Sequence, residues 1–227
     1  MAPGLTCIRC LDGLPHPWHD NGEPNPDERY EPGGPMAPPK HLKENSVSWI
    51  GLVGRAGVGK DYTAERMAEI DERFCRVSFA DEVRFEIQEA FGWDRFEVLW
   101  SKPYPEVIRR LLQWWGTDLR RSEDSEYWVN KTEQHAINAM ADTLFPVFTD
   151  VRFGNEADMI RRNNGILVRV EASESVRRER LGGLPWEHSS ESESDRIPCD
   201  MTVVSEVGNP KYSDEVQAVV NAALAPF

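Results

Sequence analysis

Residues 54–61 read GRAGVGKD, and this stretch decides the fold. It fits the pattern G-x-x-x-x-G-K, with Asp61 following the lysine where Ser or Thr is usual. The apolar run VSWIGLV at 47–53 predicts a buried strand before it, and the residues from Asp61 onward predict a helix. In this setting the glycines allow a tight turn whose backbone N–H groups face phosphate oxygens, and the helix adds the positive end of its dipole. The stretch therefore predicts a phosphate-binding loop.

Two side chains of this loop carry its expected chemistry. Lys60 would reach the β- and γ-phosphates of a bound nucleotide as a mobile point charge. Asp61 offers a carboxylate that can hold Mg²⁺ directly or through water, and it can also cap the first turn of the helix. A glycine-rich turn without a ligand is the alternative, which the in-register lysine argues against. The expected nucleotide-binding residues are Gly54, Arg55, Ala56, Gly57, Val58, Gly59, Lys60, Asp61 and Tyr62.

Strands and helices alternate along the rest of the chain. Further apolar runs predict strands at 75–79, 146–150, 165–171 and 201–204, and apolar spacing predicts helices at 61–72, 82–91, 105–115, 125–141, 155–162, 173–181 and 213–224. Such alternation is typical of an α/β fold in which a parallel sheet is covered by helices on both faces.

Composition excludes several classes of function. The 227 residues include 26 Lys+Arg and 39 Asp+Glu, so the formal net charge is −13. This balance argues against a protein that binds a nucleic-acid polymer or an anionic membrane. No apolar run approaches the ~20 residues of a membrane helix, and the N-terminus lacks the apolar core of a signal peptide. We therefore expect a cytoplasmic protein without a membrane or nucleic-acid partner.

Four metal-ligating side chains lie close together near the N-terminus. They are Cys7, Cys10, His16 and His19. Two thiolates and two imidazoles make a tetrahedral zinc set, although the spacing is tighter than in ordinary zinc fingers. The alternative is a tail in which the pairs are coincidental. Zinc at this segment, residues 1–19, is thus one expectation.

Proline is concentrated just beyond that segment. Nine of the 16 prolines lie in the first 47 residues, and residues 20–46 combine them with glycines and acids. Such a stretch sustains neither a helix nor a central strand, so it predicts an extended linker. The packed domain is expected to occupy residues 47–227.

Several stretches of this domain carry a resemblance. They are GRAGVGKDYTAE at 54–65, RRLLQWWGTD at 109–118 with YWV at 127–129, DVRFGNEA at 150–157 and WEHSSE at 186–191. In this order they resemble the phage-type deoxynucleoside monophosphate kinases, while the unusual G-K-D is shared with animal phosphomevalonate kinases. The resemblance covers about residues 48–227. It implies a P-loop kinase fold with a small lid, ATP and Mg²⁺ as cofactors, and transfer of the γ-phosphoryl group to a deoxynucleoside 5′-monophosphate.

The resemblance also implies an acceptor site. Its residues are Arg109, Arg110, Gln113, Gly116, Thr117, Trp128, Asp150, Arg152 and Glu156. Arg109 and Gln113 share a helix face, which suits a phosphate and a base edge; a solvated helix end is the alternative. Asp150 and Arg152 follow a strand, where parallel sheets place ligands, so Arg152 would bind the acceptor phosphate and Asp150 would orient Mg²⁺ water or that phosphate. A local ion pair is the alternative for these two, and core filling is the alternative for Trp128.

The expected catalytic set is Lys60, Asp61, Asp150 and Arg152, with Asp61 and Asp150 at Mg²⁺. An arginine-rich helix followed by two glycines resembles a lid that closes over the nucleotide. Its candidates are Arg177, Arg178 and Arg180, with His188 in the same region. A basic surface helix is the alternative interpretation of this segment.

The chain departs from the resembled family at two places. Tyr62 follows G-K-D where Thr is common, as in phosphomevalonate kinases, and SEVG at 205–208 stands where family members tend to carry Asn-x-Gly, which weakens the case for an adenine contact there. Two alternative functions therefore remain open: a kinase for another phosphorylated metabolite, and an ATP-binding interaction protein without transfer activity. A homodimer is compatible with the sequence.

Overall fold

The computed structural model describes residues 49–92, 97–100, 105–141, 144–182 and 193–225. All of them belong to one unit that comprises residues 43–227. The expected zinc ligands Cys7, Cys10, His16 and His19, the expected linker at 20–46 and the lid candidate His188 lie outside the described residues.

The described strands form a parallel sheet of five. They are β1 (Ile50–Val53), β2 (Phe74–Val77), β3 (Phe145–Val151), β4 (Ile166–Glu171) and β5 (Met201–Val204). Their order is β2-β3-β1-β4-β5, and every neighbouring pair is parallel. The predicted α/β fold is confirmed.

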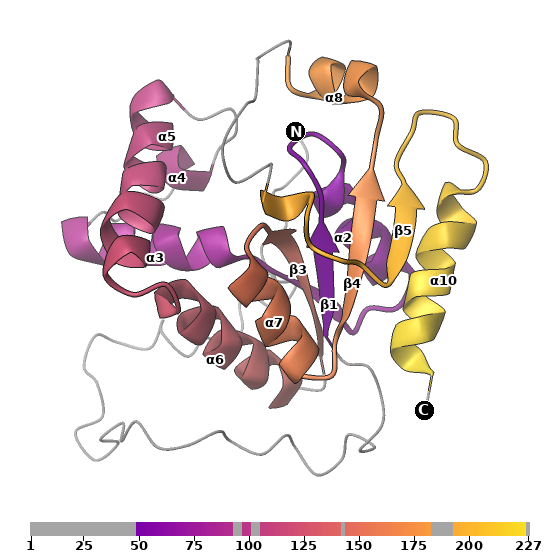
Figure 1. Ribbon diagram of the computed structural model, residues 1–227, viewed down its shortest axis with the longest axis horizontal. Coiled ribbons are helices and arrows are strands. Elements are labelled where there is room, and N and C mark those ends of the chain that lie inside the picture. The colour runs from indigo at the N-terminus through magenta and orange to yellow at the C-terminus, as the bar shows by residue number, and fades with distance from the viewer. Residues whose placement is uncertain (1–48, 93–96, 101–104, 142–143, 183–192, 226–227) are drawn as a thin grey trace. The chain divides into compact units, whose positions relative to one another are not determined.

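Helices cover both faces of this sheet (Figure 1). Helices α2 (Lys60–Ile70) and α10 (Tyr212–Leu224) lie on one face and contact each other. Helices α6 (Tyr127–Ala141) and α7 (Gly154–Arg162) lie on the other face, where α6 also contacts α3 (Phe79–Phe91). Among the described residues, no helix has the length and apolar character needed to cross a membrane.

The core is aromatic where β1 and β3 meet. Trp49 is 1% exposed, and its ring lies 5.2 Å from that of Phe148, which lies 5.8 Å from that of Phe79. The side chains of Ile50 and Leu52, which follow in the same strand, are fully buried. This cluster fixes the strand that leads into the phosphate loop.

One predicted helix differs in form from its expectation. Helix α5 (Glu106–Gln113) does not end near residue 115 but continues directly as the π-helix η1 (Trp114–Arg121). A π-helix widens the turn by one residue, and it is often found at functional sites. The short helix α4 (Glu97–Trp100) was not expected from the sequence.

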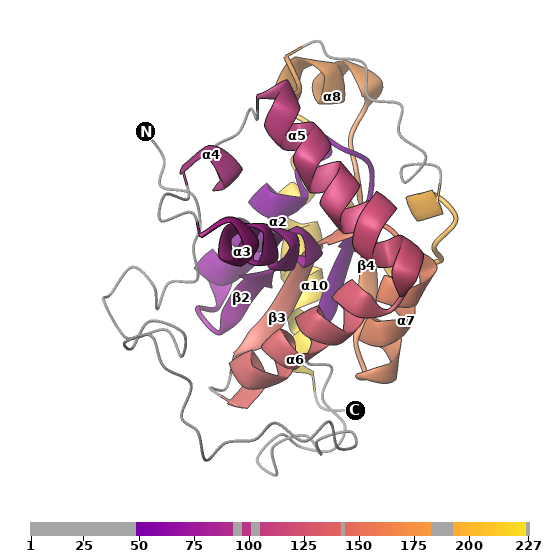
Figure 2. The same ribbon diagram turned by 90° about the vertical axis from the view of Figure 1, so that its left-hand side faces the viewer.

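The carboxyl ends of the strands define the functional end of the molecule. Helix α8 (Glu174–Arg180) follows β4 directly at that end. Both Figure 1 and Figure 2 show α5 and α8 at this end of the sheet. Open parallel sheets bind their ligands at this position.

Candidate active site

The phosphate loop connects β1 to α2 as predicted. Gly57 and Gly59 have φ values of 78° and 98°, which favour glycine. At Gly57 a side chain would also crowd helix α8, because an added Cβ would lie 3.0 Å from Leu181 Cγ. The loop therefore depends on its glycines both for its turn and for the approach of α8.

Lys60 lies across this loop. Its Nζ donates hydrogen bonds to the carbonyl oxygens of Gly54, at 2.6 Å, and Arg55, at 3.0 Å. Since Lys60 is the first residue of α2, its ammonium group lies beside the positive end of the helix dipole. The ammonium group and the helix dipole together make this position suited to binding an anion.

Asp61 is half exposed, and Arg76 lies beside it. Asp61 Oδ1 accepts a hydrogen bond from Arg76 Nε at 3.4 Å, and Arg76 Nη1 donates to Asp81 Oδ2 at 2.7 Å. Burial opposes the charged form of Arg76, but Asp81 and Asp61 nevertheless raise its pKa. No sequence motif points to Arg76, because the residue comes from β2, 15 positions away from Asp61.

Asp150 caps the N-terminus of helix α3. It accepts hydrogen bonds from Ser78 Oγ at 2.7 Å, Phe79 N at 3.0 Å and Ala80 N at 2.9 Å. These bonds explain why α3 begins at Phe79, earlier than the apolar spacing predicted. Asp150 as a Mg²⁺ residue stays a prediction.

Two expected acceptor residues, Trp128 and Glu156, are buried. Trp128 is 1% exposed and donates from Nε1 to the carbonyl oxygen of Gly116 at 2.7 Å, so it fills the core. Glu156 is 2% exposed and accepts hydrogen bonds from the backbone N–H groups of Arg152 and Phe153. Burial favours the core-filling alternative for Trp128 and a structural contact for Glu156, and substrate contact by either side chain stays a prediction.

Four of the other acceptor candidates, Arg109, Arg110, Gln113 and Thr117, are at least partly exposed. Arg109 and Arg110 share a helix with exposed Gln113, as predicted, and both pair with Glu106. Hydrogen bonds from Arg109 and Arg110 lower the pKa of Glu106. Thr117 is exposed on η1, whereas Gly116 is buried and Arg152 is half-buried at the end of β3.

The structure separates the three lid arginines. Arg177 Nε donates to the carbonyl oxygen of Ala56 at 2.8 Å, and Arg180 Nη1 donates to that of Val58 at 3.0 Å. Arg178 instead pairs with Glu174 on its own helix, and its side chain is 72% exposed. Arg177 and Arg180 thus hold α8 against the phosphate loop, and Arg178 faces solvent; their role in a lid stays a prediction.

A second contact joins the loop to the chain beyond the lid. Arg55 Nε donates to the two carboxylate oxygens of Asp195 at 3.1 and 3.2 Å. The hydrogen bonds from Arg55 lower the pKa of Asp195. This partner lies 140 residues away from Arg55, so spacing in the sequence could not reveal it.

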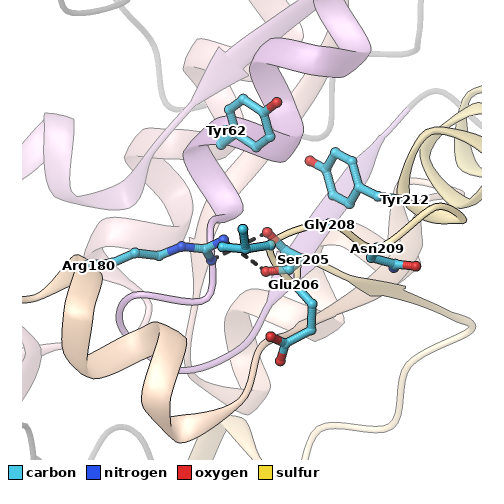
Figure 3. A pocket seen from close by; sticks show the side chains of 8 residues that line it. Tyr62, Arg180, Ser205, Glu206, Gly208, Asn209 and Tyr212 are labelled. Carbon is cyan, nitrogen blue, oxygen red and sulfur yellow. Dashed lines mark hydrogen bonds between the residues drawn. The ribbon is translucent and has the colours of Figure 1, made fainter.

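A pocket of about 300 Å³ opens beside the loop, between α2, α8 and the segment after β5 (Figure 3). Its aromatic side is made by Tyr62 and Tyr212, whose rings stack with centroids 5.7 Å apart. Arg180 lies on the opposite side, where Nη2 donates to the carbonyl oxygen of Ser205 at 2.9 Å. The remaining lining residues are Glu206, Val207, Gly208 and Asn209. The segment 205–208, whose sequence departs from the resembled family, therefore lines a pocket.

Comparison with known proteins assigns the family. The sequence model of the family named deoxynucleotide monophosphate kinase matches residues 61–181, which is more than half of the chain. The chain belongs to this family. As a member of the deoxynucleotide monophosphate kinase family, the protein is a P-loop kinase. No curated protein matches the chain.

Solved structures resemble this family member in fold. TT1252 from Thermus thermophilus is 17% identical and has a TM-score of 0.50, with coverage of 79% of this chain and 99% of that chain. The APS kinase of Mycobacterium tuberculosis, solved with AMPPNP and APS, is 9% identical with a TM-score of 0.48, covering 80% and 99% of the two chains. The shikimate kinase of Acinetobacter baumannii, solved with shikimate, is 15% identical with a TM-score of 0.39, covering 78% and 93%.

The family match includes α5, η1, the turn after β3 and α8, but it ends before the segment 205–209. No group of three or more His, Cys, Asp or Glu side chains suited to a metal ion occurs in the part of the chain that the structure describes. The individual roles of the site residues stay predictions.

Proposed function

We propose that the protein transfers the γ-phosphoryl group of ATP to the 5′-phosphate of a deoxynucleoside monophosphate, which gives a deoxynucleoside diphosphate and ADP. The observation that carries this proposal is the placement of two sets of cations at one end of the sheet. Lys60 belongs to the phosphate loop and Arg177 and Arg180 of α8 contact that loop, while Arg109 and Arg110 lie on α5, which reaches the same end of the sheet (Figure 1). Transfer between two phosphates needs cations on both anions.

The proposed donor site combines the phosphate loop with the pocket beside it. The N–H groups at the start of α2 and Lys60 would bind the phosphates of ATP. The base would enter the pocket of Figure 3, where Tyr62 and Tyr212 supply an aromatic side and Arg180 a cationic one. A concave site with a few polar groups is typical of small-ligand recognition.

Mg²⁺ fits the donor set at the loop. The half-exposed carboxylate of Asp61 lies at the start of α2, and carboxylate oxygens are the ligands that this ion prefers. Asp61 would hold the ion, directly or through water. Bound Mg²⁺ would neutralise charge on the transferred phosphoryl group.

The acceptor phosphate would be held by arginines, and the reaction needs no strong base, because the acceptor is already an anion. Arg152 would bind the acceptor phosphate bidentately at the end of β3. Gln113 and Thr117, both exposed, would contact the base or sugar. Arg109 and Arg110 would exchange Glu106 for phosphate when the acceptor binds.

An acceptor screen tests this function. The protein is incubated with Mg²⁺-ATP and each of dAMP, dGMP, dCMP and dTMP, and ADP release and the diphosphate product are measured. We expect at least one deoxynucleotide to raise ADP release well above the ATP-only blank. Ribonucleotides and phosphomevalonate serve as comparison acceptors. Turnover with phosphomevalonate alone, or with none of the acceptors, would contradict the proposal.

A further inference from the structure

The turn between β3 and α7 is organised around one buried carboxylate. Glu156 Oε2 accepts the backbone N–H of Arg152 at 2.7 Å and that of Phe153 at 3.1 Å. Its other oxygen, Oε1, accepts a hydrogen bond from Arg121 Nη2 at 2.7 Å. One carboxylate therefore sets the backbone that carries Arg152 and at the same time holds a side chain from another element.

That side chain belongs to the last residue of the π-helix η1. Arg121 is largely buried, with 15% of its side chain exposed, and its guanidinium lies 4.0 Å from the centroid of the Phe153 ring. A planar guanidinium can make a directed ion pair and stack on a ring at the same time, which an ammonium group cannot. Arg121 thus contacts the turn at two places, Glu156 and Phe153.

A second link joins the same turn to the chain just beyond η1. Asn155 Nδ2 donates to the carbonyl oxygen of Ser125 at 2.8 Å and to Glu126 Oε1 at 2.8 Å. The turn after β3 is therefore bound to the chain on both sides of residues 122–124. Asn155 and Glu156 of the DVRFGNEA stretch both make hydrogen bonds at this junction. These contacts account for an amide and a carboxylate at the two positions without a contact to substrate.

We propose that Arg121 is a positioning residue for the acceptor nucleotide: its contacts with Glu156 and Phe153 fix η1 relative to the turn that carries Arg152. This inference rests on the proposed function, in which Arg152 binds the acceptor phosphate while Gln113 and Thr117 contact the rest of the acceptor. Those residues come from segments about 35–40 positions apart in the chain, so their spacing needs a tertiary link. The Arg121–Glu156 junction supplies it.

The π-helical form of η1 makes such a link necessary. π-Helices are rare and occur mostly as single turns, so we expect the two-turn-long η1 to depend on contacts outside the helix. In phosphoryl transfer, positioning contributes much of the catalysis, and a displacement of about 1 Å can cost as much as 10²-fold in rate. Loss of the Arg121–Glu156 junction should therefore weaken the binding of the acceptor more than the binding of ATP.

The test compares Arg121→Met with Arg162→Met. Arg162 pairs with Glu133 and also joins α7 to α6, but the pair is partly exposed and Arg162 lies at the far end of α7. With the acceptor found in the screen, we expect Arg121→Met to raise the acceptor KM by about ten- to a hundredfold while the ATP KM stays within about twofold. Arg162→Met should leave both within about twofold.

Further variants separate positioning from folding. Glu156→Gln should act in the same direction as Arg121→Met, and the double variant should be no worse than the worse single one, because both remove one junction. Arg121→Lys keeps the positive charge, and it replaces Arg121→Met in these measurements if Arg121→Met does not fold. An equal rise in the KM values for ATP and for the acceptor, or an unchanged acceptor KM, would overturn the inference.

A readout without substrate keeps the inference separate from the proposed function. Hydrogen–deuterium exchange at the amides of Arg152, Phe153 and η1 should accelerate in Arg121→Met and not in Arg162→Met. If no deoxynucleotide is phosphorylated but these amides respond, the proposed function fails and the junction stands. If the amides do not respond, the junction is refuted whatever the screen shows.

Discussion

Lys60 provides the residue-scale prediction that is nearest to the chemistry. Its Nζ donates to carbonyl oxygens of the phosphate loop itself, at 2.6 and 3.0 Å, so removing it disturbs little of the core. We expect Lys60→Ala to lower kcat/KM by about 10²- to 10³-fold or more, which is the range for losing one preorganised donor to a transition state. Far-UV circular dichroism should remain that of the wild type; a loss of helical signal would contradict this interpretation.

At the same scale, the site divides into residues that sequence could predict and residues that it could not. Lys60 and Asp61 were predictable because the strand, the glycines and the helix that place them are contiguous. Arg76, Arg121 and Asp195 were not, because each acts on a partner 15 to 140 residues away. Long-range pairing of charges leaves no periodic pattern in one sequence.

At the scale of elements, η1 shows why helix periodicity was not enough. Apolar spacing predicted a helix at 105–115, but the helix continues beyond that range as η1. Glu86 of α3 stabilises η1 by accepting hydrogen bonds from Trp115 Nε1 at 3.0 Å and Arg120 Nε at 2.6 Å. Tyr127 and Lys131 of α6 donate to the same carboxylate. Burial opposes ionisation, yet these four hydrogen bonds lower the pKa of Glu86 to about 2. The π-helix is therefore stabilised by tertiary contacts that a 3.6-residue period does not encode.

Helix α8, which the sequence predicts to be a lid, gives the element-scale prediction. Arg180 donates to Gly57, Val58 and Ser205, whereas Arg178 is 72% exposed and pairs only weakly across one turn of α8. We expect Arg180→Ala to weaken ATP binding by about tenfold or more, since charge-assisted hydrogen bonds contribute about 1.5–3 kcal/mol. Arg178→Ala is the matched control and should stay within about twofold. Isothermal titration with a non-hydrolysable ATP analogue measures both, and equal effects of the two variants would contradict the assignment.

At the scale of the whole molecule, the fold class was predictable because alternation of strands and helices is a property of the entire chain. That alternation does not determine the strand order β2-β3-β1-β4-β5, since several orders satisfy it equally well. The formal charge of −13 gave no sign that arginines gather around the phosphate loop at one end of the sheet. The net charge of the chain therefore does not predict the local charge of the site, which depends on how the fold brings the arginines together.

The pH dependence of stability is the whole-molecule prediction. Burial raises the pKa of Glu156 from 4.5 to about 7, against the opposing effect of Arg121. The hydrogen bond to Glu82 raises the pKa of His135 above its usual 6.5. Both groups bind protons more tightly when folded, so the stability they contribute is complete below their unfolded pKa values and is lost as the pH rises through the folded ones. Glu86, with a pKa near 2, changes stability only below about pH 4.5.

Between pH 5 and pH 8 the free energy of unfolding should therefore fall, and Tm should fall by several degrees. Repulsion within a chain of charge −13 acts in the same direction as the histidines lose their protons. Glu156→Gln cannot ionise, so its Tm should vary less with pH, while Glu89→Gln, on the exposed side of α3, should keep the wild-type slope. Differential scanning fluorimetry across this range measures the three slopes. A wild-type Tm that rises from pH 5 to pH 8, or equal slopes for the wild type and Glu156→Gln, would show that the buried carboxyl group is ionised throughout.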